Sequence, residues 1–200
     1  MKIKAIIFDA DGVLVLGGKD RKRFSQIYAE KFGLPIETMM PFFQDEMQDC
    51  LVGKKDLKVE LKKYIKSWKW HGSVEEFVDF WLKEEANINE ELIALLPNLK
   101  AKGIKLALGT NNEKYRTDFL WNTVGLGKHL DHSYASHAVG LKKPNQPYFE
   151  HIIKDLNLPA KEILFVDDDH KNVDAAKESG MNAEFYSSFE TFKKDLAKYL

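Results

Sequence analysis

The sequence predicts an α/β fold in which a doubly wound parallel sheet carries a small helical insert after its first strand. Three short apolar runs have the composition of strands buried on both faces: Ile3–Phe8, Ile104–Leu108 and Ile163–Val166. Each run ends in polar residues and is followed by a helical pattern, and this alternation favours parallel strands joined by helices. The long helical stretch between the first two runs predicts the insert.

The insert extends over residues 15–91 and is called the cap region below. It shows helical periodicity without a convincing strand, and Ser73 with Glu76 fits the capping box that begins a helix. Because a loop of this length is uncommon in a compact domain, we expect a small helical subdomain. The expected helices are Arg21–Phe32, Glu37–Asp49, Asp56–Trp68 and Val74–Glu85.

The remainder, residues 1–14 and 92–200, is the expected catalytic core. Two weaker strand candidates, His132–Ala135 and Ala183–Tyr186, would complete its sheet. Gly103 and Gly180 stand where glycine commonly ends a helix. The expected helices of the core are Glu90–Lys102, Glu113–Val124, Tyr148–Leu156, Lys171–Ser179 and Phe189–Leu200.

Composition argues against several classes of partner. The chain has 30 basic and 31 acidic residues and a formal net charge of -1, so we expect neither a nucleic-acid nor a membrane partner. The apolar start of the chain is interrupted by Asp9 and Asp11, which a signal peptide would not tolerate. The single cysteine, Cys50, excludes an internal disulfide and fits a reducing compartment. We therefore expect a cytoplasmic protein that acts as a monomer or weak homodimer.

Reactive side chains follow each of the three strong strands. Open α/β sheets bind ligands outside the carboxyl ends of their strands, so these side chains should meet. Asp9 and Asp11 follow the first strand, and their spacing points both carboxylates the same way in extended backbone. One carboxylate can attack phosphorus while the other transfers a proton. The competing interpretation is a polar strand end that forms an Asx turn.

Four segments, in order, resemble the motifs of the haloacid-dehalogenase-like (HAD) hydrolase superfamily. They read FDADGVL, LALGTNN, GLKKPNQPYF and ILFVDDDHKNVDAAKESGM, and they cover the core nearly end to end. The cap region falls at the first cap position of that superfamily, between the first two motifs. The resemblance implies a Rossmann-like core and a phosphatase that works through an aspartyl-phosphate intermediate.

The resemblance also implies roles for individual residues. Asp9 would be the nucleophile and Asp11 the general acid/base. Thr110 would donate its hydroxyl to the phosphoryl group, with Asn111 as a second phosphate contact. Lys143 would neutralise Asp9 and the phosphoryl oxygens. One alternative stays open here, because the adjacent Lys142 competes with Lys143. Thr110 also fits a capping box with Glu113, a second role that is compatible with the phosphate contact.

The crowded carboxylates point to a hard divalent cation, and Mg²⁺ takes oxygen ligands. The candidate side-chain ligands are Asp9 and one or both of Asp167 and Asp168. The resemblance adds the backbone carbonyl of Asp11, makes Asp168 the usual direct ligand, and lets Asp167 bind directly or through water. Asp169 is instead placed to cap the helix that begins near Lys171.

The expected activity is therefore Mg²⁺-dependent hydrolysis of a small phosphorylated metabolite. Three alternatives share the fold: a phosphomutase, a haloacid dehalogenase, and a catalytically silent binding protein. The acidic residues beyond Asp9 argue against the dehalogenase, which needs neither a metal nor a leaving-group acid. Candidate substrate contacts near the loops of the cap region are Asp20, Arg21, Gly53, Lys54, Trp70 and His71, although each also fits a solvated or structural role.

Overall fold

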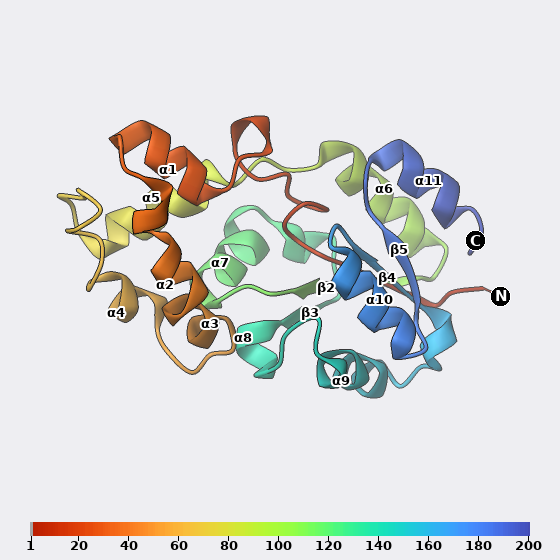
Figure 1. The fold of residues 1–200 in the computed structure, drawn as a ribbon. Coiled ribbons are helices and arrows are strands. Elements are labelled where there is room, and N and C mark those ends of the chain that lie inside the picture. Colours follow the sequence, from red (N-terminus) through yellow and green to blue (C-terminus); the bar gives the residue numbers. More distant parts are fainter. Residues whose placement is uncertain (1) are drawn as a thin grey trace.

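A five-stranded, entirely parallel sheet forms the centre of the molecule in the computed structural model, which describes residues 2–200 (Figure 1). The strand order is β3-β2-β1-β4-β5, so the chain moves to one side of β1 and later to the other. This order confirms the doubly wound α/β fold, including its two weaker strands. The strands are β1 (Ala5–Phe8), β2 (Lys105–Thr110), β3 (His132–Ala135), β4 (Ile163–Asp167) and β5 (Asn182–Phe185).

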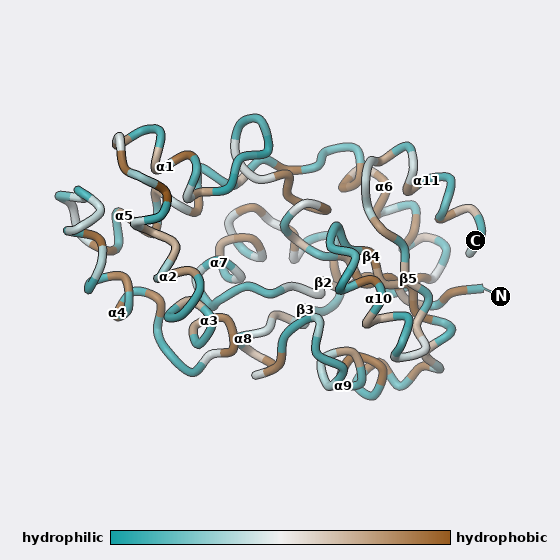
Figure 2. Tube along the Cα trace, viewed as in Figure 1, coloured by the Kyte–Doolittle hydropathy of each residue, from teal (hydrophilic) through white to brown (hydrophobic). Residues whose placement is uncertain are grey.

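Helices cover both faces of this sheet and bury its apolar side chains. On one face, α6 (Glu90–Ala101) and α11 (Phe189–Leu196) pack against alternate residues of β1, β2 and β4. On the other face, α9 (Gln146–Leu156) and α10 (His170–Glu178) do the same. Figure 2 shows apolar residues on these helices alternating with hydrophilic ones, as one-sided burial requires. Both faces of the strands are thus removed from water, which explains their uninterrupted apolar composition.

Five helices of the cap region form a separate apolar cluster at the opposite end of the molecule from the chain termini (Figure 1). Aromatic rings dominate this cluster, and Trp68, Phe24 and Phe77 are at most 1% exposed. The two connections to the core run beside each other, because the Leu16 N–H donates to the Asn87 carbonyl. The helices are α1 (Phe24–Phe32), α2 (Met40–Gln44), α3 (Glu46–Leu51), α4 (Leu57–Leu61) and α5 (Val74–Glu84).

The predicted lengths of two helices in the cap region were wrong. The stretch Glu37–Asp49 divides at Asp45, where φ and ψ are -110° and -77°. The stretch Asp56–Trp68 is regular only over α4 and continues as turns, up to a left-handed Lys69. In both cases, packing of aromatic side chains into the shared cluster overrides local helix propensity.

Smaller differences occur at other helices. The first helix of the cap region begins at Phe24, after a short 3₁₀ turn at Lys19–Arg21. The predicted helix Glu113–Val124 consists of α7 (Lys114–Asp118) and a π-helical turn at Phe119–Thr123. A one-turn helix, α8 (Ser136–Val139), was not predicted. Within residues 2–200, no helix has both the length and the apolar character needed to cross a membrane.

Candidate active site

The carboxyl ends of three neighbouring strands bring the predicted site residues together. Phe8 of β1 is in register with Leu108 of β2 and with Val166 of β4. The next residue, Asp9, donates its N–H to the Val166 carbonyl and so remains beside the end of β4. Because β1 lies where the strand order reverses, its end faces the crevice in which such sheets bind ligands.

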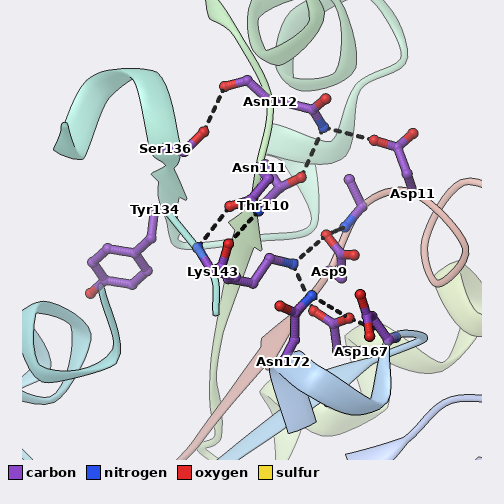
Figure 3. A network of polar contacts seen from close by, with 12 residues as sticks. Asp9, Asp11, Thr110, Asn111, Asn112, Tyr134, Ser136, Lys143, Asp167 and Asn172 are labelled. Atoms are coloured by element: carbon purple, nitrogen blue, oxygen red, sulfur yellow. Dashed lines mark hydrogen bonds and ion pairs between the residues drawn. The ribbon is translucent and has the colours of Figure 1, made fainter. Parts of the chain in front are cut away.

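A buried lysine joins two carboxylates at this edge (Figure 3). Lys143 Nζ lies 2.8 Å from Asp9 Oδ1 and 2.6 Å from Asp167 Oδ2. The side chains of Lys143 and Asp167 are 1% and 0% exposed. Burial alone would lower the pKa of Lys143, but the two carboxylates raise it above its ordinary value. This ammonium is therefore held charged against the candidate nucleophile.

The two adjacent lysines occupy different environments. Lys142 Nζ donates to Gln48 Oε1 of α3 at 2.6 Å, whereas Lys143 enters the site. Asn111 fixes the backbone of Lys143: Asn111 Nδ2 donates to the Lys143 carbonyl, and the Lys143 N–H donates to Asn111 Oδ1, both at 2.9 Å. Both polar groups of Asn111 are thus engaged in orienting the lysine, and the phosphate contact predicted for Asn111 stays a prediction.

Asp9 combines a buried carboxylate with one oxygen that is free of protein donors. Its Oδ1 accepts from the Ala10 N–H at 2.6 Å and from Lys143, while Oδ2 has no hydrogen bond to residues 2–200. Burial raises the pKa of Asp9 to about 8; Lys143 lowers it in part, and Asp167 adds to the increase. In the absence of a further cation, this carboxylate is electrostatically unfavourable.

Asp11 points into the same region from the loop after β1, and its carboxylate has two partners. Arg116 Nη2 of α7 lies 2.5 Å from Asp11 Oδ1, and Asn112 Nδ2 lies 2.9 Å from Asp11 Oδ2. Burial would raise the pKa of Asp11, but Arg116 and these hydrogen bonds lower it below its usual value. Arg116 Nη2 also donates to the Glu85 carbonyl at 3.1 Å, so one guanidinium connects Asp11 with the end of the cap region.

Thr110 lies at the end of β2 and does not cap the following helix, so the additional capping role predicted for it was wrong. Glu113 is the N-cap residue of α7, and its carboxylate accepts from the N–H groups of Tyr115 and Arg116. The Thr110 hydroxyl oxygen instead accepts from Asn112 Nδ2 at 2.8 Å. Its proton is therefore available to a group in the cavity.

Asp9, Asp167 and Asp168 form an acidic cluster whose ligand atoms lie within 4.8 Å of one another. Both oxygens of Asp167 already accept hydrogen bonds, Oδ2 from Lys143 and Oδ1 from Asn172 and the Asp169 N–H. Three carboxylates beside one ammonium leave two negative charges, which match one divalent ion. The donor set, all oxygen, fits Mg²⁺. Asp169 itself caps α10 through the Lys171 N–H, as predicted.

Gly12 provides space for this cluster. Its φ is +89°, and a Cβ built there would lie 1.9 Å from Asp168 Oδ2. Any side chain at this position would therefore displace the Asp168 carboxylate. Glycine serves here both as a left-handed turn residue and as a point of close approach.

The site opens into a cavity of about 660 Å³. Its buried part is lined by Asp9, Thr110 and Lys143, and its wall also includes residues 16–17 and 21–23 of the cap region. Among the predicted substrate contacts, Arg21 contributes to this wall. Asp20, Gly53, Lys54, Trp70 and His71 are not among the lining residues that the structure describes.

Three residues whose side chains hold the predicted carboxylates were themselves not predicted: Asn112, Arg116 and Asn172. Asn172 could have been found, because it lies one helical turn after the acidic cluster and faces the end of β4. Arg116 could not, since its carboxylate partner is 105 positions away in sequence.

Comparison with known proteins agrees with this geometry. A family model described as haloacid dehalogenase-like hydrolase matches residues 3–180. A sesquiterpene phosphatase of Aspergillus oryzae is 30% identical over 96 residues, and a GMP/IMP nucleotidase of Escherichia coli is 31% identical over 96 residues. These matches cover 45% and 48% of this chain and only 46% and 43% of the two relatives.

Solved structures share the fold. A HAD family enzyme of Bacteroides thetaiotaomicron, bt-2542, in complex with magnesium and inorganic phosphate has a TM-score of 0.77 at 19% identity, covering 94% of this chain and 96% of that one. A predicted HAD-like hydrolase of Porphyromonas gingivalis has a TM-score of 0.78 at 22% identity, covering 98% of each chain. With the family model matched over most of its length, the chain belongs to the haloacid dehalogenase-like hydrolase family.

Proposed function

We propose that this protein is a Mg²⁺-dependent phosphatase that hydrolyses a small phosphorylated metabolite, with Asp9 as nucleophile and Asp11 as general acid/base. The observation that carries the proposal is the arrangement at the end of β1. Asp9 has one oxygen without a protein donor and is held by buried Lys143, and the carboxylate of Asp11 lines the same cavity. The phosphatase and the nucleotidase among its relatives support the reaction class.

In the first step, Asp9 Oδ2 attacks phosphorus, the bond from phosphorus to the leaving oxygen breaks, and Asp11 gives its proton to that oxygen. Lys143 and Thr110 stabilise negative charge on the phosphoryl oxygens. In the second step, water attacks the aspartyl-phosphate and Asp11 takes the water proton. Inorganic phosphate leaves and Asp9 is regenerated.

The Arg116–Asp11 ion pair favours the carboxylate form of Asp11, which is the form needed for the second step. The first step needs the acid form, so Asp11 must exchange Arg116 for the leaving-group oxygen. Because Arg116 also contacts the Glu85 carbonyl, movement of the cap region would alter both contacts together.

Mg²⁺ would be held by Asp9 and Asp168, by Asp167 directly or through water, and by the backbone carbonyl of Asp11. When bound, it would neutralise the carboxylates and let an anionic phosphate approach them. The two engaged oxygens of Asp167 favour Asp168 as the more direct ligand.

Turnover of a panel of phosphorylated metabolites and p-nitrophenyl phosphate tests the proposal. Hydrolysis is expected with Mg²⁺, should stop in EDTA and should return when Mg²⁺ is restored. Ca²⁺ should substitute poorly, because its coordination shell is larger and less regular. Failure to hydrolyse any phosphate ester with Mg²⁺ would contradict the proposal, and full phosphatase activity in EDTA would contradict its Mg²⁺ requirement.

A further inference from the structure

Three consecutive cations, Arg21, Lys22 and Arg23, line the cavity that contains Asp9. They belong to the loop between β1 and α1, whose part just before α1 is hydrophilic in Figure 2. The proposed phosphoryl chemistry uses the buried part of the cavity, where Asp9, Thr110 and Lys143 lie, whereas Arg21 and Arg23 are exposed. The cationic loop is therefore not accounted for by catalysis at phosphorus.

The loop holds a defined shape. The Arg21 N–H donates to the Gly18 carbonyl and the Gly18 N–H donates to the Lys22 carbonyl, both at 3.0 Å. Asp20 and Arg21 each have φ of 58°, a left-handed conformation that residues other than glycine seldom adopt. A Cβ at Gly18 would lie 2.3 Å from Ile27 Cδ1, so α1 packs closely beneath the turn. Hydrogen bonds and packing thus fix the backbone that carries the three cations.

The three cations differ in whether they already have partners. Lys22 Nζ is paired with both carboxylate oxygens of Glu30 at 2.7 Å. Neither Arg21 nor Arg23 has an ion pair or a side-chain hydrogen bond with residues 2–200. Both side chains belong to exposed residues at the edge of the cavity. Two guanidinium groups are consequently available to a ligand.

One carboxylate in the same wall, that of Glu85, does not oppose an anion. It accepts from the Phe24 N–H through Oε1 at 2.5 Å and from Trp81 Nε1 through Oε2 at 2.8 Å. Both of its oxygens are thus directed at protein donors. Among the three cations and this carboxylate, the two arginines are the groups whose side chains have no hydrogen bond or ion pair with residues 2–200.

We propose that the substrate carries a second anionic group, a carboxylate or a second phosphate, on the leaving-group side, and that Arg21 and Arg23 bind it. This inference rests on the proposed phosphatase function. Guanidinium groups bind carboxylate and phosphate through paired, charge-assisted hydrogen bonds. A cavity of about 660 Å³ accommodates a small dianionic or trianionic metabolite with one charged group at each end.

Three phosphate esters that differ at one group test this directly. 3-Phosphoglycerate carries a carboxylate where glycerol 3-phosphate carries a hydroxymethyl group, and glycerol 1,3-bisphosphate carries a second phosphate there. Glycerol 3-phosphate is called the neutral ester below because its leaving group is uncharged, and the other two are called the anionic esters. We expect the wild type to favour one or both anionic esters in kcat/KM by about 10- to 100-fold, as expected for hydrogen bonds to a charged group. Whichever ester is favoured identifies the anionic group.

Arg21→Gln and Arg23→Gln, singly and together, should reduce the ratio of kcat/KM between the anionic and neutral esters toward one. Lys19→Gln is the matched control. Lys19 lies in the same turn, but it lines a separate hollow with Glu30 and Glu84, so its substitution should preserve the ratio. Equal use of all three esters by the wild type, or a ratio unchanged in the double variant, would overturn the inference.

A binding measurement separates this inference from the catalytic proposal. In the Asp9→Asn background, isothermal titration calorimetry with the same esters reports affinity without turnover. A binding preference for the anionic esters that disappears when both arginines are substituted supports the inference. It does so even if the wild type hydrolyses none of the esters, because absence of hydrolysis would contradict only the phosphatase proposal. Equal affinity for the neutral and anionic esters would overturn the inference even if the phosphatase activity is found.

Discussion

Asp9→Asn is expected to stabilise the metal-free protein while it removes activity. Asp9 is 8% exposed, and burial raises the pKa of its carboxyl from 3.8 to about 8. Asparagine has the same shape, and its Oδ1 can keep the hydrogen bonds from the Ala10 N–H and from Lys143. The substitution therefore removes a buried titratable carboxyl with little other change in contacts.

The pH dependence of the free energy of unfolding gives the size of this stabilisation. Between pH 3.8 and 8 the folded protein retains a proton on Asp9 that the unfolded chain releases, so raising the pH favours unfolding. The stability due to this group is present at low pH and is lost as the pH rises toward the folded-state pKa. The expected slope is about 1.4 kcal/mol per pH unit. Asparagine does not titrate, so the advantage of the variant over the wild type should grow with that slope from pH 5 to pH 8.

Urea denaturation in EDTA at pH 5, 6, 7 and 8 measures this difference in the free energy of unfolding. Asp174→Asn, which makes the same substitution at an exposed position of α10, is the control. Added Mg²⁺ should stabilise the wild type more than Asp9→Asn, because the ion compensates the carboxylate. A difference between Asp9→Asn and wild type that stays constant from pH 5 to pH 8 would show that the buried carboxyl of Asp9 does not retain its proton.

Two other substitutions examine the surroundings of Asp9. Lys143→Met should abolish turnover and destabilise the protein by about 3–5 kcal/mol in urea denaturation, because it leaves buried carboxylates without their partner. Lys142→Met is the control, since Lys142 contacts Gln48, and it should retain most of the activity and most of the stability. Equal effects of the two substitutions would contradict the assignment of Lys143. Gly12→Ala should weaken Mg²⁺ activation by about 10- to 100-fold, since its Cβ would occupy the position of the Asp168 carboxylate, and an unchanged Mg²⁺ titration would count against that site.

The sheet and the ends of its strands could be predicted from the sequence because their signals are local. An apolar run such as Ile163–Val166 specifies a buried strand, and the acidic residues after it necessarily fall at the ligand-binding edge. The same reasoning predicts that Asp9 and Asp167 meet, and they lie in one acidic cluster. Lys143 rather than Lys142 occupies the buried position, and only the resemblance to the family's motif distinguished the two in sequence.

Features that depend on distant contacts could not be predicted. The pairing of Arg116 with Asp11 joins α7 to the loop after β1, and no local pattern indicates it. The irregular turns after α4 have the same origin: Trp68 packs against Phe42 and Phe77, which come from separate helices. Tertiary packing there determines the backbone, whereas the sequence pattern records only amphipathic spacing.

The proposed mechanism requires that Asp9 receives the phosphoryl group and that Asp11 transfers the protons. Asp11→Asn cannot transfer a proton, so hydrolysis of esters with poor leaving groups should fall by about 10²–10⁴-fold. p-Nitrophenyl phosphate needs little protonation of its leaving group, so it should still phosphorylate Asp9, and the adduct should persist because the amide does not activate water.

Rapid-quench mass spectrometry of Asp11→Asn with p-nitrophenyl phosphate and Mg²⁺ measures both roles at once. The expected result is a phosphoryl adduct on the peptide that contains Asp9, absent from the Asp9→Asn, Asp11→Asn double variant. Equal loss of activity on both kinds of ester, with no adduct although Mg²⁺ binds normally, would rule out Asp11 as the acid/base of this mechanism.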